Sequence, residues 1–87
     1  QSIVSEGCQV YGSVKRSVLF PNVMVSDGAQ VIDSVLMPGV TVAPHAVVRR
    51  AVVGPDTVVA ENARVGDDGP ITLLVDRGRG GRKVVIE

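Results

Sequence analysis

The sequence predicts an all-β solenoid, in which short strands wind into stacked coils of similar length. Residues at equivalent positions recur every 17 residues, as Pro21, Pro38 and Pro55 do. Valine is the most frequent apolar residue and favours strands. The 87 residues include only two aromatic side chains, Tyr11 and Phe20, which are too few for an ordinary globular core.

Each coil divides into two units of six residues and one of five, a hexapeptide repeat. The first units are Leu19–Met24, Val25–Gln30 and Val31–Val35, and Leu36 begins the next coil. The first residue of a unit is predicted to point inward, so that Leu19, Leu36 and Val53 stack. The fifth residue is expected to fit inside near a corner; these residues are Val23, Ala29, Val35, Val40, Ala46, Val52, Thr57 and Ala63.

Prolines and glycines between the units would interrupt any helix, so essentially no helix is expected. The pattern predicts about three to four coils. Residues 2–17 are an imperfect copy of the repeat, which predicts an irregular first coil. If the offset of 17 residues is extended back, Cys8 takes the inward position that Val25 and Val42 occupy in later coils. A repeat unit that begins at Val4 fits this part of the sequence better.

The repeat stops after Gly66. Two apolar segments, Ile71–Val75 and Lys83–Glu87, are predicted to form short strands that cover the open end of the solenoid. A flexible basic loop joins them. We therefore divide the chain into a β-helix over residues 1–66 and a capping tail over residues 67–87.

Nine basic and nine acidic residues cancel, which gives no electrostatic case for nucleic acid or an anionic membrane as partner. No apolar run approaches the roughly 20 residues of a membrane span. The single cysteine suits a reducing, cytoplasmic compartment. The sequence opens on Gln1 without an initiator methionine, and we expect a fragment of a longer protein.

Several segments resemble the C-terminal domain of ADP-glucose pyrophosphorylases, the glucose-1-phosphate adenylyltransferases of glycogen and starch synthesis. The similar segments are Ser2–Cys8, Ser17–Val23, Gly28–Val40 and the pair Arg49-Arg50. The Asp33-Ser34-Val35-Leu36-Met37-Pro38-Gly39 stretch within the third segment is the most specific of them.

The resemblance implies a left-handed parallel β-helix that packs on an N-terminal catalytic domain and contributes to a tetramer. It also implies that sugar-phosphate or nucleotide effectors act near this domain. The parent enzyme makes ADP-glucose and diphosphate from ATP and glucose 1-phosphate with Mg²⁺. No Gly-rich nucleotide loop follows a strand here, so we expect neither a catalytic residue nor a metal or cofactor site in this chain.

Four cations of the basic loop, Arg77, Arg79, Arg82 and Lys83, suit an anionic effector, although a solvated loop is the simpler interpretation. His45 is expected at a solvated corner. Arg16 and Arg50 could each pair with Asp33 along the stack.

The outward residues Phe20 and Met37 follow the inward leucines, and Met24 and Val58 share a second outward column. Exposed apolar residues usually mark an interface. We therefore expect these four residues to contact the catalytic domain or a second subunit.

Two alternatives remain open from the sequence. One is the hexapeptide domain of an acyltransferase, in which His45 would serve as general base. The other is the β-helix domain of a different sugar-phosphate nucleotidyltransferase.

Overall fold

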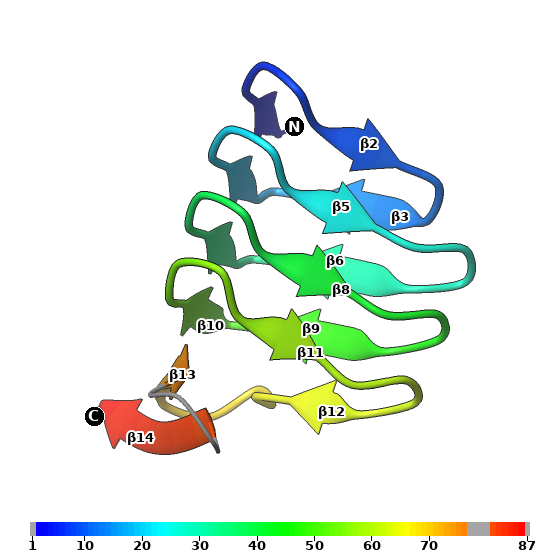
Figure 1. Cartoon of the computed structure of the whole chain (residues 1–87). Helices are drawn as coiled ribbons and strands as arrows, with labels where there is room; N and C mark the ends of the chain where they lie inside the picture. Colours follow the sequence, from blue (N-terminus) through cyan, green and yellow to red (C-terminus); the bar gives the residue numbers. More distant parts are fainter. Residues whose placement is uncertain (1, 77–80, 87) are drawn as a thin grey trace.

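The structure is a computed structural model that describes residues 2–76 and 81–86, with side chains described for residues 2–74. These residues form an all-β solenoid of stacked coils and contain no helix, as the sequence predicts (Figure 1). Hence no helix in the described ranges could cross a membrane. The strands are β1 (Ile3–Val4), β2 (Gln9–Val10), β3 (Ser13–Lys15), β4 (Val18–Leu19), β5 (Met24–Val25), β6 (Gln30–Ile32), β7 (Val35–Leu36), β8 (Thr41–Val42), β9 (Val47–Arg49), β10 (Ala51–Val53), β11 (Val58–Val59), β12 (Arg64–Val65), β13 (Ile71–Asp76) and β14 (Gly81–Ile86).

Three sheets form the three sides of the solenoid, and each strand of the coils pairs in parallel with its equivalent in the next coil. Sheet A has the order β1-β4-β7-β10-β13-β14, sheet B the order β11-β8-β5-β2, and sheet C the order β12-β9-β6-β3. Leu19 pairs with Leu36, and Leu36 pairs with Val53. This register confirms the 17-residue repeat.

The interior consists of columns of aliphatic side chains, one column for each sheet. Leu19, Leu36 and Val53 are fully buried, and so are Val25 with Val42 and Val31 with Val48. Burial of one aliphatic side chain contributes about 1.5–3 kcal/mol, and stacking repeats that gain in each coil.

The five-residue unit differs from the prediction at its corner. Val35 and Val52 were expected inside, but they are only half-buried, and Ser34 and Ala51 occupy the buried positions. The reason is the backbone: Asp33 and Arg50 have φ values of 50° and 46°. This left-handed turn directs the following residue inward and the next one outward.

The first coil is irregular, as predicted, and the alternative frame from Val4 is the correct one. Val4 pairs with Leu19 and Val10 with Val25, an offset of 15 residues, whereas Val14 pairs with Val31. The assignment of Cys8 to the column of Val25 is therefore wrong, because Val10 takes that position.

Gly12 permits the shorter turn in this coil. A Cβ atom at Gly12 would lie 2.3 Å from the carbonyl oxygen of Ala29 and 2.7 Å from that of Ser26. Only glycine allows the chain to approach the second coil so closely.

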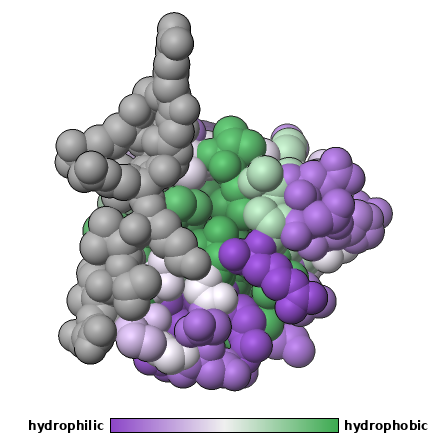
Figure 2. Space-filling model, turned by 90° about the horizontal axis from the view of Figure 1, so that it is seen from below, coloured by the Kyte–Doolittle hydropathy of each residue, from purple (hydrophilic) through white to green (hydrophobic). Residues whose placement is uncertain are grey.

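The C-terminal segment forms the two predicted strands, β13 and β14, which pair antiparallel. β13 also pairs in parallel with β10, so the hairpin extends sheet A, while sheets B and C end at β11 and β12. Figure 2 views this end of the molecule and shows hydrophobic residues at its centre, with hydrophilic residues to the right and below. The inward residue Val65, at the end of the column in sheet C, keeps 8% of its surface exposed.

Candidate functional site

His45 lies at an exposed corner, as predicted, and its φ of 64° places it in the left-handed region. The imidazole lies against Gly28 of the preceding coil, where a Cβ atom would approach Nδ1 to 2.3 Å. Cys8 is half-buried against the core, and its thiol donates to the carbonyl oxygen of Phe20 at 3.2 Å. Within the described ranges, no three His, Cys, Asp or Glu side chains gather as a metal site requires.

The corner between sheets C and A, here called the third corner, carries different chemistry on its two sides. Its inner side is a ladder of serines. Ser17 Oγ accepts the amide of Ser34 at 3.1 Å, and Ser34 Oγ accepts the amide of Ala51 at 3.2 Å. Each hydroxyl also donates to a carbonyl two residues earlier, at 2.8 Å. The ladder therefore satisfies amides that are buried between the coils.

The outer side of the third corner carries a stack of charged residues: Arg16, Asp33 and Arg50. Arg16 binds the carboxylate of Asp33 through Nε at 2.7 Å and Nη2 at 3.2 Å. The hydrogen bond from Arg16 lowers the pKa of the Asp33 carboxyl below its usual value, and the positive charges of Arg50 and Arg49 act in the same direction. The same hydrogen bond raises the pKa of Arg16.

Arg50 does not pair with Asp33, in contrast to the prediction. Its Nε atom donates to the carbonyl oxygen of Gly69 at 2.9 Å, because the segment between β12 and β13 passes the third corner. Arg49 binds the carboxylate of Asp68 in the same segment through Nη2. The two arginines therefore hold the linker that leads into the C-terminal hairpin.

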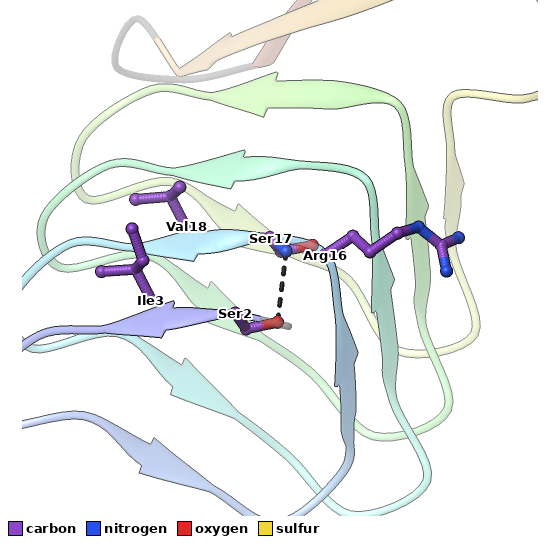
Figure 3. Close-up of a pocket in the computed structure, with 5 residues that line it drawn as sticks. All are labelled: Ser2, Ile3, Arg16, Ser17 and Val18. Atoms are coloured by element: carbon purple, nitrogen blue, oxygen red, sulfur yellow. Dashed lines mark hydrogen bonds between the residues drawn. The ribbon is translucent and has the colours of Figure 1, made fainter.

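A surface pocket of about 560 Å³ lies at the N-terminal end of sheet A, beside the third corner. Its lining residues are Ser2, Ile3, Arg16, Ser17 and Val18. Figure 3 shows Ile3 and Val18 side by side, while the guanidinium of Arg16 points away from them. The amide of Ser17 donates to Ser2 Oγ at 3.2 Å, which continues the serine ladder into the first coil.

The outer side of sheet A is apolar along the whole solenoid. Its central column pairs Ile3 with Val18, Val18 with Val35, Val35 with Val52, and Val52 with Leu73. Phe20 and Met37 follow β4 and β7 and extend this surface toward the next corner. We call it the apolar face; it comprises Ile3, Val18, Phe20, Val35, Met37, Val52 and Leu73.

The four predicted interface residues lie on both sides of one corner. Phe20, which is 36% exposed, and Met37 lie at the edge of the apolar face. Met24 and Val58 lie on sheet B with Thr41 between them, as expected, and Val58 is 63% exposed. Their role as an interface stays a prediction.

The central column of the apolar face was not predicted from the sequence. Val35 and Val52 were assigned to the interior, so neither was predicted to lie on the outer surface. The recurrence of Ser17 and Ser34 at the repeat interval, each directly after a polar residue, was the available signal for the correct corner.

Of the basic tail residues, Arg77 and Arg79 lie outside the described residues. Arg82 and Lys83 belong to β14, whose side chains are likewise outside the described part. Their role in binding an anionic effector stays a prediction.

The sequence of this chain is similar to those of known proteins. Residues 1–71 match the family model described as GlmU-like, C-terminal hexapeptide. A 34-residue segment is 65% identical to the glucose-1-phosphate adenylyltransferase of Acetivibrio thermocellus, and covers 39% of this chain and 8% of that protein. A segment of 34 residues is 53% identical to the enzyme of the same name from Bacillus thuringiensis, and covers 39% of this chain and 9% of that protein.

The matched segment thus spans less than a tenth of these relatives. The family model, in contrast, covers most of the chain. It includes the strands β1, β4, β7 and β10 of sheet A and ends at the first residue of β13. On this evidence the chain belongs to the GlmU-like, C-terminal hexapeptide family.

Proposed function

We propose that this chain is the regulatory and assembly domain of a glucose-1-phosphate adenylyltransferase and has no catalytic site of its own. The proposal rests on the 65% identity of a 34-residue segment to a glucose-1-phosphate adenylyltransferase. The apolar face supports the assembly role. An apolar surface that continues over every coil of one sheet is typical of a protein contact.

In this proposal the catalytic domain belongs to the same polypeptide and binds ATP, glucose 1-phosphate and Mg²⁺. The solenoid holds that domain in place and joins subunits into a homo-oligomer, with a tetramer implied by the family resemblance. The reaction transfers an adenylyl group from ATP to glucose 1-phosphate and releases diphosphate. Such an enzyme works in the cytoplasm.

The decisive experiment measures diphosphate release from ATP and glucose 1-phosphate by the whole polypeptide that contains this chain. The 87-residue chain alone is the matched control. We expect turnover by the whole polypeptide and none by the control. Turnover by the chain alone, or a coenzyme A-dependent acyl transfer that is lost in His45→Ala, would contradict the proposal.

The assembly role has a separate test in the same polypeptide. Phe20→Ala and Met37→Ala shorten two side chains at the edge of the apolar face. We expect weaker domain docking or a smaller oligomer, with the fold of the solenoid retained. An unchanged oligomer of unchanged stability would count against this role.

The basic tail supplies the candidates for a regulatory site. We expect Arg79→Gln and Arg82→Gln to reduce activation by a sugar phosphate or nucleotide, because each removes a guanidinium that can bind phosphate. Activation that stays unchanged for every effector tested would exclude the tail from regulation.

A further inference from the structure

The dipeptide Asp-Gly occurs twice in this chain, as Asp27-Gly28 and as Asp68-Gly69. In such a pair the backbone nitrogen of glycine can attack the side-chain carboxyl group of aspartate, because glycine has no Cβ atom to block the approach. The product is a succinimide ring. Ring closure requires rotation about the Cα–C bond of the aspartate, so the local hydrogen bonds decide whether a given pair reacts.

The Asp27-Gly28 pair is fixed in one conformation. It forms the centre of a β-turn in which the amide of Ala29 donates to the carbonyl oxygen of Ser26 at 3.1 Å. The φ of 75° at Gly28 makes this a type II turn. The carbonyl oxygen of Asp27 also accepts the amide of His45 at 3.2 Å. Rotation about the Cα–C bond of Asp27 would break both hydrogen bonds, so the fold protects this pair.

The Asp68-Gly69 pair lies in the linker between β12 and β13, outside both strands. The side chain of Asp68 is 79% exposed. Within the described part of the chain, Asp68 makes no hydrogen bond from backbone to backbone. Gly69 is bound only by the side chains of Asp67 and Arg50 among the described residues, and side chains can move with it. The Cα–C bond of Asp68 can therefore rotate while the coils stay paired.

The neighbouring residue Asp67 supplies a base for the reaction. The amide of Gly69 donates to Asp67 Oδ1 at 2.8 Å, so the proton that must leave the attacking nitrogen already points at a carboxylate. Arg49 acts in the opposite direction, because it binds Asp68 in the charged form, which reacts slowly. An ion pair at such an exposed position contributes little, so Arg49 slows the reaction without preventing it.

We propose that Asp68-Gly69 is a site of spontaneous isoaspartate formation and that Asp27-Gly28 is not. The nitrogen of Gly69 bonds to Cγ of protonated Asp68, and its proton passes to Asp67. That proton then returns to the hydroxyl group that leaves Cγ as water. Water opens the ring at either carbonyl, and opening at the main-chain carbonyl leaves the chain connected through the side chain of residue 68. One water molecule is released and one is consumed, so the sum is an isomerisation.

The modified linker contains one more backbone carbon, which changes how the C-terminal hairpin is attached. The carbonyl oxygen of Gly69 accepts Nε of Arg50 at 2.9 Å. Three residues later, the amide of Thr72 donates to the carbonyl oxygen of Arg50 at 3.0 Å, where β13 joins sheet A. A longer linker displaces Gly69 from Arg50. Isomerisation therefore loosens the start of β13.

The test keeps the 87-residue chain for several weeks in mildly acidic buffer at physiological temperature, in water enriched in heavy oxygen. Trypsin then releases one peptide for each Asp-Gly pair, because arginines flank both pairs. Fragmentation by electron transfer distinguishes isoaspartate from aspartate and locates the heavy oxygen atom that ring opening adds. We expect isoaspartate to form at least about fivefold faster at Asp68 than at Asp27.

The same two peptides, synthesised and unfolded, are the matched control for the effect of the fold. We expect similar rates in the two peptides, because both contain an Asp-Gly pair. Equal rates at Asp27 and Asp68 in the folded chain would overturn the proposal. A difference of the same size between the unfolded peptides would overturn it as well, because the fold would then protect neither pair.

Two variants test the roles of the neighbouring residues. Asp67→Ala removes the base, and we expect the rate at Asp68 to fall about threefold or more. Arg49→Gln removes the opposing ion pair, and we expect the rate at Asp68 to rise. Glu61→Ala removes an exposed carboxylate elsewhere in the last coil and should leave the rate unchanged. A rate at Asp68 that is the same in Asp67→Ala as in the natural chain would contradict the mechanism.

Hydrogen exchange of the purified isoaspartate form tests the effect on the hairpin. We expect faster exchange at the amide of Thr72 and unchanged exchange at the amide of Ser26, which donates to Val42 between two coils. Unchanged exchange at Thr72 would contradict the loosening of β13. Neither readout involves adenylyl transfer, so the modification site and the proposed function can fail independently.

Discussion

The two sides of sheet A carry the same kind of residue in different surroundings. On the inner side, Leu19, Leu36 and Val53 are fully buried by the stacked coils. On the outer side, the neighbouring residues Val18, Val35 and Val52 are only half-buried. The interior column is explained by the fold, because stacking alone removes it from water. The outer column is less deeply buried by the described part of the chain.

The other two sheets show that an apolar exterior is not a general property of this solenoid. The outer column of sheet B has polar residues at two of its four positions. The equivalent column of sheet C has polar residues at three of its four positions. These columns are Gln9, Met24, Thr41 and Val58 in sheet B, and Ser13, Gln30, Val47 and Arg64 in sheet C. The difference supports the proposal that sheet A is the side that contacts a protein partner.

The largest expected effect comes from shortening an inner residue. Leu36→Ala should lower the free energy of unfolding by about 2–5 kcal/mol, because it leaves a cavity between two coils. Val35→Ala, one residue away on the outer side, should cost less than about 1 kcal/mol. Urea unfolding of both variants measures the difference, and equal losses would erase the distinction between the two sides.

A smaller effect is expected at the serine ladder of the third corner. Ser34→Ala removes the acceptor of the Ala51 amide, and the unpaired buried N–H should lower stability by about 1–3 kcal/mol. Ser26→Ala removes a hydroxyl from a different corner and serves as the control. Hydrogen exchange at the Ala51 amide reports the change directly: faster exchange is expected in Ser34→Ala alone.

The smallest effect concerns the exposed pair of Arg16 and Asp33. Because the pKa of Asp33 is lower in the folded chain than in the unfolded chain, the pair stabilises the fold above the unfolded pKa. This stabilisation is lost as the pH falls through the folded pKa. Thermal unfolding between pH 7 and pH 2 should show a slightly shallower acid dependence in Asp33→Asn than in the natural chain. Identical pH profiles would show that the pair contributes nothing.

The sequence predicted the solenoid and its inner columns because their residues recur at a fixed interval. Leu19, Leu36 and Val53 stack as expected, since a regular offset places equivalent residues in register. The terminal hairpin was also predictable, because two apolar segments flank a glycine-rich loop. Periodicity is a strong signal wherever the coil keeps its length.

The predictions failed where the coil length or the direction of the chain changes locally. Val35 was placed inside because the sequence does not show that Asp33 adopts a left-handed turn. Cys8 was misplaced because the first coil is shorter at Gly12. The pairing of Arg50 with Gly69 depends on the path of the linker, which lies outside the repeat.

The same limit applies to the candidate sites. Phe20 and Met37 were recognisable as outward apolar residues because each follows an inward leucine. The continuous surface from Ile3 to Leu73 appeared only with the strand register. The contact of Arg49 with Asp68 could not be predicted at all, because it depends on the position of one linker carboxylate.

The central claim is that the apolar face is a contact surface of the whole polypeptide. Its most direct test is the sedimentation of that polypeptide with Val35→Asp, compared with Thr41→Asp on the outer column of sheet B. Circular dichroism of the 87-residue chain with each substitution checks that the solenoid still folds. We predict that Val35→Asp yields a smaller assembly and that Thr41→Asp leaves the assembly intact. A Val35→Asp polypeptide that sediments like the natural protein would contradict the claim.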